Sequence, residues 1–306
     1  MTKKLPSLTI GIPAYNEEKN IANLLDSIYD QVYQSVRLKQ VVIICDGCSD
    51  NTIKIVKRYK KHYLNIKIVT SSHRSGKASA LNKIYDLSNS DYLMTIDADV
   101  VFMGKKSIDK MAKAMINNSR LNMVGPSHMP TTSHTLFGNL SRVSALLFLD
   151  AVSQYNHGSN FYSCMSVEFM RKSFYKSYRF PAGTIADQCY AYGQSIKNNH
   201  HGFKLIKGAL VIFGVAQTFH DWRVLSVRST IGDKSDTIKH FGNSVLPLYT
   251  IPRELLIRST LKWLLKSPIY CVGAVIMNLF IRIFPYNHKV ENGVWEMVES
   301  SKELYL

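Results

Sequence analysis

Cysteine is scarce in this chain. The five residues among 306 are an odd number, which argues against a framework of paired disulfides. Cys45 and Cys48 form a C-x-x-C motif. A zinc site would need a second such pair, and a redox motif would need to open a helix. We therefore expect reduced thiols without a catalytic or metal-binding role.

Long apolar runs are also missing. The N-terminus enters a strand pattern without the apolar segment of a secretion signal, so we expect a cytoplasmic protein. Near the C-terminus, the uncharged run Ser267–Ile281 is shorter than the roughly 20 residues of a bilayer crossing. Pro268 and Asn278 interrupt it further.

Apolar stripes and basic residues alternate instead over residues 254–284. We expect amphipathic helices there that lie on an anionic membrane surface, with their basic residues toward the head groups. A pair of ordinary core helices under the sheet is the alternative. The basic residues in and beside this segment are Arg253, Arg258, Lys262, Lys266 and Arg282.

Acidic residues are few. The 22 acidic residues stand against 38 basic ones, a net charge of +16 that indicates an anionic partner. The sequence has no RNP strand or zinc finger, so we expect phosphates or a membrane surface rather than nucleic acid. With 46% hydrophobic and 20% charged residues, the chain can form a globular core.

Strand and helix patterns alternate through the first part of the chain. This alternation predicts an α/β fold with a mostly parallel sheet, covered by helices on both faces. A further strand is expected near residue 123 and over 203–213, extended chain over 159–167, and a helix opening at Asp187. The predicted strands cover residues 8–13, 40–45, 66–71 and 92–96, and the predicted helices cover 20–28, 52–63, 78–87 and 107–117.

The predicted strand 92–96 ends in two aspartates, Asp97 and Asp99. Carboxylates two residues apart on extended chain point the same way and repel each other unless a cation lies between them. Mg²⁺ or Mn²⁺ prefers such oxygen ligands and commonly keeps substrate phosphates in its coordination shell. The pair therefore predicts a metal–diphosphate site, although an Asp-x-Asp turn in solvent is the simpler alternative.

Other polar residues follow the carboxyl ends of neighbouring predicted strands. Tyr15 and Glu17 follow the first strand, Asp46 follows the second, and Lys77 opens a helix after the third. In parallel sheets, ligands bind outside the carboxyl ends of the strands. We expect one shared cleft that collects these side chains and the aspartate pair.

Four motifs in this order resemble those of family 2 glycosyltransferases, enzymes of the GT-A fold. The resemblance covers about residues 6–215. Each motif alone is weakly specific, but four in order at strand ends form a strong signal. The motifs are Ile12-Pro13-Ala14-Tyr15-Asn16-Glu17-Glu18, Asp46-Gly47-Cys48-Ser49-Asp50-Asn51-Thr52, Gly76-Lys77-Ala78-Ser79-Ala80-Leu81-Asn82 and Asp97-Ala98-Asp99.

The resemblance implies roles for the matching residues. Asp46 would accept from the base ring of the donor, with helix capping as the alternative, and Lys77 would lie near the ribose or phosphates. Asp99 would bind Mn²⁺ or Mg²⁺ directly, while Asp97 and Ala98 would lie near the ribose and diphosphate. The first-strand loop that would hold the nucleoside contains Pro13, Ala14, Tyr15 and Glu17.

The catalytic base implied by the resemblance is Asp187. Inverting members carry a Glu-Asp pair at a helix start, and its Asp deprotonates the acceptor hydroxyl. This chain keeps the Asp but has Ala186 in place of the Glu. The alternative role for Asp187 is to cap its helix.

The Gln-x-x-Arg-Trp motif of processive members is absent. In its place the chain has Phe219-His220-Asp221-Trp222-Arg223, which disfavours processive polymer synthesis. His220 is predicted as a further metal ligand, or else a packed or hydrogen-bonded residue. Trp222 is predicted to stack on a sugar or to pack in the core.

The sequence thus predicts an inverting glycosyltransferase. It would use a UDP- or GDP-sugar donor, a divalent metal, and a glycan or lipid-linked acceptor at the cytoplasmic membrane surface. We expect a GT-A domain over residues 1–220 and a mainly helical extension over 221–306. Within the domain, residues 1–125 would form the nucleotide-binding half and residues 126–220 the acceptor half.

Two other functions stay open at this point. A nucleotidyltransferase also uses a carboxylate pair with Mg²⁺, but it would need a glycine-rich triphosphate loop, which residues 13–18 do not provide. The Ala at position 186 and the absent processive motif also allow a non-catalytic membrane-surface binding protein on a degenerate transferase scaffold.

Overall fold

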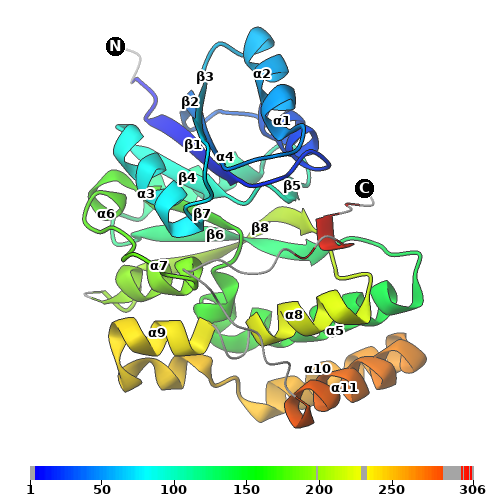
Figure 1. Cartoon of the computed structure of the whole chain (residues 1–306). Helices are drawn as coiled ribbons and strands as arrows, with labels where there is room; N and C mark the ends of the chain where they lie inside the picture. The colour runs from blue at the N-terminus through cyan, green and yellow to red at the C-terminus, as the bar shows by residue number, and fades with distance from the viewer. Residues whose placement is uncertain are drawn as a thin grey trace.

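The computed structural model describes residues 4–197, 199–228, 233–284, 298, 300–302 and 304. Its centre is an eight-stranded sheet in the order β3-β2-β1-β4-β7-β6-β8-β5 (Figure 1). The strands are β1 Ser7–Ala14, β2 Arg37–Asp46, β3 Ile66–Ser71, β4 Tyr92–Ile96, β5 Val100–Phe102, β6 Met123–Pro130, β7 Val167–Arg171 and β8 Phe203–Phe213.

Helices cover both faces of the sheet, as the strand–helix alternation predicts. Apolar side chains of β1 and β2 pack against α1, α2 and α4 on one face, and other side chains of β2, with those of β4, pack against α3, α6 and α7 on the opposite face. The helices are α1 Ile21–Tyr29, α2 Thr52–His62, α3 Lys77–Leu87, α4 Ser107–Asn117, α5 Leu136–Gln154, α6 Lys172–Tyr175, α7 Asp187–Ile196, α8 Phe219–Val227, α9 Asp233–Phe241, α10 Arg253–Lys266 and α11 Pro268–Ile283.

The first four strands are parallel neighbours: β2 pairs with β3 and β1, and β1 pairs with β4. Their carboxyl ends therefore meet at one edge of the sheet. Beyond β4, strand β7 enters antiparallel, with Thr95 opposite Glu168. The predicted α/β fold with a mostly parallel sheet is confirmed, but the antiparallel strand came from a segment that the sequence did not place.

The expectation of extended chain over residues 159–167 is wrong for the middle of that segment, while Asn160 and Cys164 on either side have extended backbone. A short 3-10 helix, Phe161–Ser163, occupies the middle, and β7 begins only at Val167. The Asn160 side chain accepts from the Tyr162 amide and donates to the Val152 carbonyl. Such local side-chain bonds compete with strand pairing, which explains the turn.

The C-terminal helices α10 and α11 pack against α5 at one end of the molecule (Figure 1). Ser259 donates to the Leu147 carbonyl at 2.7 Å, and Asn278 donates to Ser144 at 2.9 Å. In the described part of the chain, one helical segment, Leu136–Gly158, has the length and composition of a membrane span. A single helix of this kind is weak evidence for a crossing.

The predicted boundary between a domain over 1–220 and an extension over 221–306 stays a prediction. Residues 285–297 of that extension lie outside the described residues.

Candidate active site

A cleft of about 220 Å³ lies at the carboxyl ends of β1, β2 and β4. It brings together all of the predicted site residues except His220. Segments far apart in the chain also contribute, including Thr184, Leu225 and Arg228. The predicted residues that line the cleft are Pro13, Ala14, Tyr15, Glu17, Asp46, Lys77, Asp97, Ala98, Asp99 and Asp187.

Lys77 forms the centre of this cleft. Its ammonium lies 2.7 Å from Asp97 Oδ1 and 2.9 Å from Asp187 Oδ2. Although burial lowers the pKa of Lys77, the two carboxylates raise it above its ordinary value. A solvated lysine at a helix start, the simpler expectation for this position, is therefore not what the fold produces.

Asp187 is the first residue of α7 and is almost fully buried. The N-cap position belongs to Ala186, whose side chain offers no acceptor, so Asp187 does not cap the helix. Its carboxylate instead pairs with Lys77, close to the favourable positive end of the helix dipole. The carboxylate thus combines burial with a fixed position on the cleft wall.

Burial raises the pKa of Asp97 to about 6; Lys77 opposes that rise, and the neighbouring Asp99 adds to it. Gln188 also donates to Asp97 at 3.3 Å. Asp99 makes no hydrogen bond or ion pair with any described residue. Its oxygens are therefore available to a ligand in the cleft.

Asp46 holds the loop before α3. Its Oδ2 accepts from the amides of Ser75 and Gly76 at 2.9 and 2.8 Å, and its Oδ1 accepts from Ser71 at 3.1 Å. Asp46 does not cap α2, which begins only at Thr52, but its Oδ2 accepts from the amide of Gly76, the N-cap residue of α3. By fixing this loop, Asp46 sets where α3 begins and so where Lys77 lies.

Tyr15 faces the cleft beneath a cation that the sequence analysis did not select. The Arg74 guanidinium lies 3.9 Å from the centre of the Tyr15 ring, a distance at which cation and ring attract. The two residues form a flat polar wall on the side of the cleft formed by the first-strand loop. No motif indicated Arg74, since it lies in an irregular loop.

Glu17 and the C-terminal Lys302 form a further ion pair, 2.7 Å apart. Burial and the nearby Asp99 raise the pKa of Glu17 to about 7, while Lys302 opposes the shift. Glu17 and Asp99 thus place two acidic groups near each other at this end of the cleft.

Glu168 is a buried acid beneath the cleft that the sequence analysis missed. It accepts from Thr95 at 2.8 Å. Burial, with a contribution from Asp187, raises its pKa to about 8. Only the antiparallel pairing of β7 with β4 brings it here, so no local sequence signal would have found it.

His220 lies apart from the cleft. Its side chain is 56% exposed, and its Nδ1 lies 3.3 Å from Asp221 Oδ1. Trp222 is buried in a cluster with Ala216, Met277 and Ile281. The expectation that Trp222 stacks on a sugar is therefore wrong, and its alternative, core packing, holds.

The carboxylates of the cleft suit a hard divalent cation. Among the described residues no three His, Cys, Asp or Glu side chains form a closed metal cage. Asp99, with Glu17 and Asp97 near it, offers oxygen ligands only, and Mg²⁺ typically takes its remaining ligands from phosphates and water. These residues fit a metal that is completed by a bound diphosphate.

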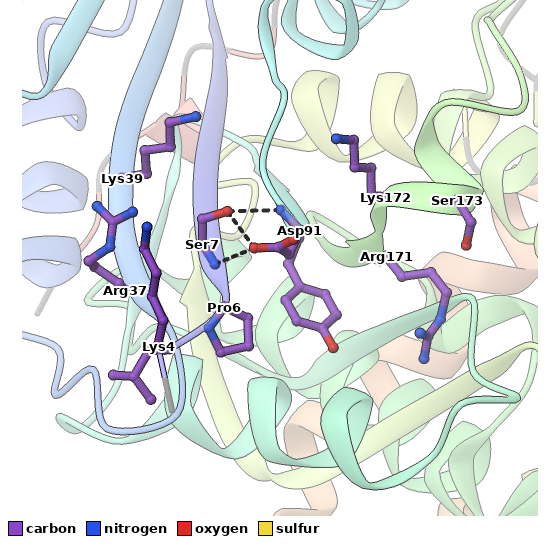
Figure 2. Close-up of a pocket in the computed structure, with 11 residues that line it drawn as sticks. Lys4, Pro6, Ser7, Arg37, Lys39, Asp91, Arg171, Lys172 and Ser173 are labelled. Atoms are coloured by element: carbon purple, nitrogen blue, oxygen red, sulfur yellow. Dashed lines mark hydrogen bonds between the residues drawn. The ribbon is translucent and has the colours of Figure 1, made fainter. Parts of the chain in front are cut away.

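A larger hollow of about 740 Å³ lies at the opposite, amino edge of the sheet (Figure 2). At its centre, Asp91 accepts from the amide and hydroxyl of Ser7, each at 2.7 Å. Cations surround this pair, but the hollow lies at the edge opposite to the carboxyl ends of the strands, where ligands of such sheets bind. The cations are Lys4, Arg37, Lys39, Arg171 and Lys172.

Comparison with protein-family models gives a match to glycosyl transferase family 2 over residues 9–179. The probable glycosyltransferase YdaM of Bacillus subtilis is 29% identical over 150 residues, 48% of this chain and 35% of the relative. The poly-beta-1,6-N-acetyl-D-glucosamine synthase of Staphylococcus epidermidis is 32% identical over 99 residues, 32% of this chain and 23% of the relative. The matches thus span about a quarter to a third of these curated relatives.

Solved structures share the fold over most of their length. The mannosyltransferase PcManGT of Pyrobaculum calidifontis, in complex with GDP-Man and Mn²⁺, has a TM-score of 0.55 at 17% identity. The alignment covers 91% of this chain and 88% of that one. S. aureus TarS 1-349, in complex with UDP-GlcNAc, has a TM-score of 0.52 at 15% identity, with coverages of 94% and 95%.

Proposed function

The chain belongs to glycosyl transferase family 2 and is a glycosyltransferase, and from this premise we propose an inverting enzyme that uses a UDP- or GDP-sugar donor. The observation that carries the proposal is the bridge from Lys77 to Asp97 and Asp187, in the cleft that also contains Tyr15 and Asp99. Neither alternative function predicts a buried base candidate beside a diphosphate site.

Asp187 acts as the base in this proposal. As the partner of Lys77 it is a carboxylate, the form that accepts a proton. The acceptor hydroxyl attacks the anomeric carbon from the face opposite the diphosphate and gives its proton to Asp187. The bond from that carbon to the diphosphate oxygen breaks, and the nucleoside diphosphate leaves. The sugar thereby changes its anomeric configuration.

The donor side uses the wall formed by Tyr15 and Arg74, with Asp46 also lining the cleft. Flat groups such as the Tyr15 ring suit the nucleoside, and Arg74 and Lys77 supply positive charge for the phosphates. Mn²⁺ or Mg²⁺, held by Asp99 with Asp97 nearby, would neutralise charge on the departing diphosphate. The complexes of TarS with UDP-GlcNAc and of PcManGT with GDP-Man and Mn²⁺ support this class of donor.

A glycan or lipid-linked glycan at the cytoplasmic face of the membrane is the proposed acceptor. One face of α11 packs on the rest of the protein through Cys271, Ala274 and Met277, which departs from the simple alternative of two core helices. The other side of α10 and α11 is apolar and exposed. Arg253, Arg258, Lys266 and Arg282 are exposed as well, whereas Lys262 pairs with Asp150 of α5. The exposed apolar residues are Ile257, Leu261, Leu265, Ile269, Val272, Ile276, Leu279, Ile283 and Phe284.

A panel of UDP- and GDP-sugars with Mn²⁺ tests the proposal. We expect one of them to raise the melting temperature, because a ligand at 100 times its Kd stabilises the folded state by about 2.7 kcal/mol. The same donor should release UDP or GDP without pyrophosphate, and NMR of the product should show the opposite anomeric configuration. Release of pyrophosphate would favour a nucleotidyltransferase, and no release from any donor would exclude catalysis with this panel.

A further inference from the structure

Three of the last five described residues of the chain line the donor cleft. We call Val298, Ser300, Ser301 and Lys302 the C-terminal strap; Val298, Ser301 and Lys302 line the cleft directly. The strap is fixed to the body of the protein by the Ser300 amide, which donates to Asp221 at 3.0 Å. In the other direction, the Gln217 amide donates to the Ser300 hydroxyl, also at 3.0 Å.

Gly214, directly after β8, leaves space for the backbone of the strap. A Cβ atom added to Gly214 would collide with the backbone carbonyl of Ser301. Only glycine allows the two backbones to approach so closely at this point. The strap is therefore seated in a groove that accommodates its backbone as well as its side chains.

Lys302 makes the contacts between the strap and the first-strand loop of the cleft. Its ammonium donates to the carbonyls of Tyr15 and Asn16, at 3.2 and 2.6 Å, and to Glu17 Oε1 at 2.7 Å. An ammonium has three hydrogens to donate, and these three acceptors use all of them. With its side chain only 12% exposed, Lys302 has no donor left for a phosphate in this position.

The cleft is also too small while the strap covers it. Its volume of about 220 Å³ is below the roughly 300–1,000 Å³ of typical small-molecule pockets. The Lys302 ammonium meanwhile contacts Glu17, which is close enough to Asp99 to feel its charge. Lys302 thus supplies positive charge beside the carboxylates that would attract a divalent cation.

We propose that the C-terminal strap closes the donor site before the donor binds and that donor binding with a divalent cation then displaces Lys302 from Glu17. The inference rests on the proposed function, because it takes the occupant of the cleft to be a nucleoside diphosphate or its sugar. In this arrangement the strap competes with the donor. The affinity measured for the donor is therefore the intrinsic affinity reduced by the fraction of molecules with an open strap.

Lys302→Met in the full-length chain tests the competition, because methionine keeps an unbranched apolar side chain but removes the ammonium. Titration calorimetry with UDP plus Mn²⁺ and with GDP plus Mn²⁺ measures the Kd. If the strap is closed about nine-tenths of the time, the variant should bind the preferred nucleotide about tenfold more tightly. Loss of a positive charge would otherwise weaken the binding of an anion, so the expected direction is opposite to simple electrostatics.

Lys67→Met provides the matched control. Lys67 is an exposed lysine of β3 outside the cleft, so its loss changes the net charge equally without touching the strap. We expect its Kd to equal that of the unaltered protein. If the unaltered protein binds UDP or GDP and Lys302→Met binds no more tightly, the strap proposal is overturned while the proposed function stands. If no variant binds either nucleotide, both proposals fail.

Hydrogen exchange of the unaltered protein gives a second measurement. The Ser300 amide is bonded to Asp221 in the closed state and should exchange faster once UDP or GDP with Mn²⁺ displaces the strap. Slower exchange with the nucleotide bound would mean that the strap closes over the ligand instead, which contradicts the proposal. An unchanged rate with the nucleotide bound would contradict it as well.

Discussion

Charge balance around Lys77 is uneven. A single ammonium contacts both Asp97 and Asp187, and Asp99 lies close enough to raise the pKa of Asp97. The three carboxylates around Lys77 thus outnumber it, so a diphosphate would meet acidic groups on this side of the cleft. A divalent cation resolves this conflict, which is why the metal belongs to the proposal together with the donor.

Asp187→Asn removes the proposed base while it keeps the size of the side chain. We expect kcat for sugar transfer to fall by about 10²- to 10⁴-fold, the usual range for general-base catalysis. The Kd for UDP or GDP with Mn²⁺ should change little, because Asp97 still holds Lys77. Asp30→Asn is the control, since Asp30 lies on the surface in a pair with Lys105. Equal transfer rates in Asp187→Asn would remove it from the mechanism.

Glu168 predicts a pH dependence of stability. Burial raises its pKa from an ordinary 4.5 to about 8, so the folded protein holds this proton more tightly than the unfolded chain does. The stabilisation is complete below about pH 4.5 and is lost as the pH rises through about 8. The loss should be on the order of a few kcal/mol.

Glu168→Gln should flatten this dependence, because glutamine has no proton to lose. Urea unfolding of both proteins at pH 5 and pH 8 measures it as the change in the free energy of unfolding. Thr95 still has an acceptor in the variant, so the hydrogen bond under the cleft is kept. The assignment would be wrong if both proteins lost the same stability between the two pH values.

At the scale of elements, the turn after β2 determines the position of the loop that precedes α3. Gly47 has a φ of +74°, and a Cβ there would lie 2.6 Å from the Arg74 amide nitrogen. The turn therefore packs directly on the loop that carries Arg74 and that Asp46 holds. Any shift of this loop would move the start of α3 and, with it, Lys77.

Gly47→Ala and Gly104→Ala separate the backbone strain of a side chain at positive φ from its steric clash with neighbouring atoms. Gly104 has nearly the same φ, +72°, but no described atom lies within 4 Å of the added Cβ. We expect Gly104→Ala to cost about 1 kcal/mol of unfolding free energy from the backbone alone. Gly47→Ala should cost about 1–3 kcal/mol more and should weaken nucleotide binding. Equal costs in urea unfolding, with unchanged affinity, would contradict the clash.

Strand pairing also explains which site residues could be predicted. Asp46, Asp97 and Asp99 follow local strand patterns, and the carboxyl ends of parallel neighbours necessarily meet at one edge. Glu168 depends on a non-local antiparallel pairing, which leaves no periodic signal in its own segment. The turn at Phe161–Ser163 was missed for a related reason, because the bonds of Asn160 override a strand-like composition.

At the scale of the whole molecule, the proposed membrane association predicts one orientation, with the exposed apolar side of α10 and α11 against an anionic surface that attracts the net charge of +16. An apolar surface with basic residues beside it binds anionic lipid through the burial of apolar area and through electrostatic attraction. The proposed lipid-linked acceptor would then be presented to an enzyme that already lies on the same surface.

Leu265→Glu tests this orientation. Leu265 on α10 is 88% exposed, and Leu64, far from these helices, is 89% exposed and serves as the matched control. We expect Leu265→Glu to reduce cosedimentation with vesicles of anionic phospholipid by several-fold, and Leu64→Glu to leave it unchanged. The binding should also weaken at high salt, because the electrostatic part is screened. Equal binding by the two variants would exclude this face as the contact.

The sequence by itself determined the fold class and most of the cleft. Hydrophobic periodicity and turn residues act over a few neighbours, so they predicted the carboxyl ends of β1 to β4 and the polar residues there, whereas the short β5 and the antiparallel β7 were not predicted. Only the tertiary structure decided what surrounds those residues: Arg74 over Tyr15, Glu168 beneath Thr95, and Lys302 against Glu17 across 285 positions of the chain. Such contacts arise when distant segments pack together, and no local pattern records which segments will meet.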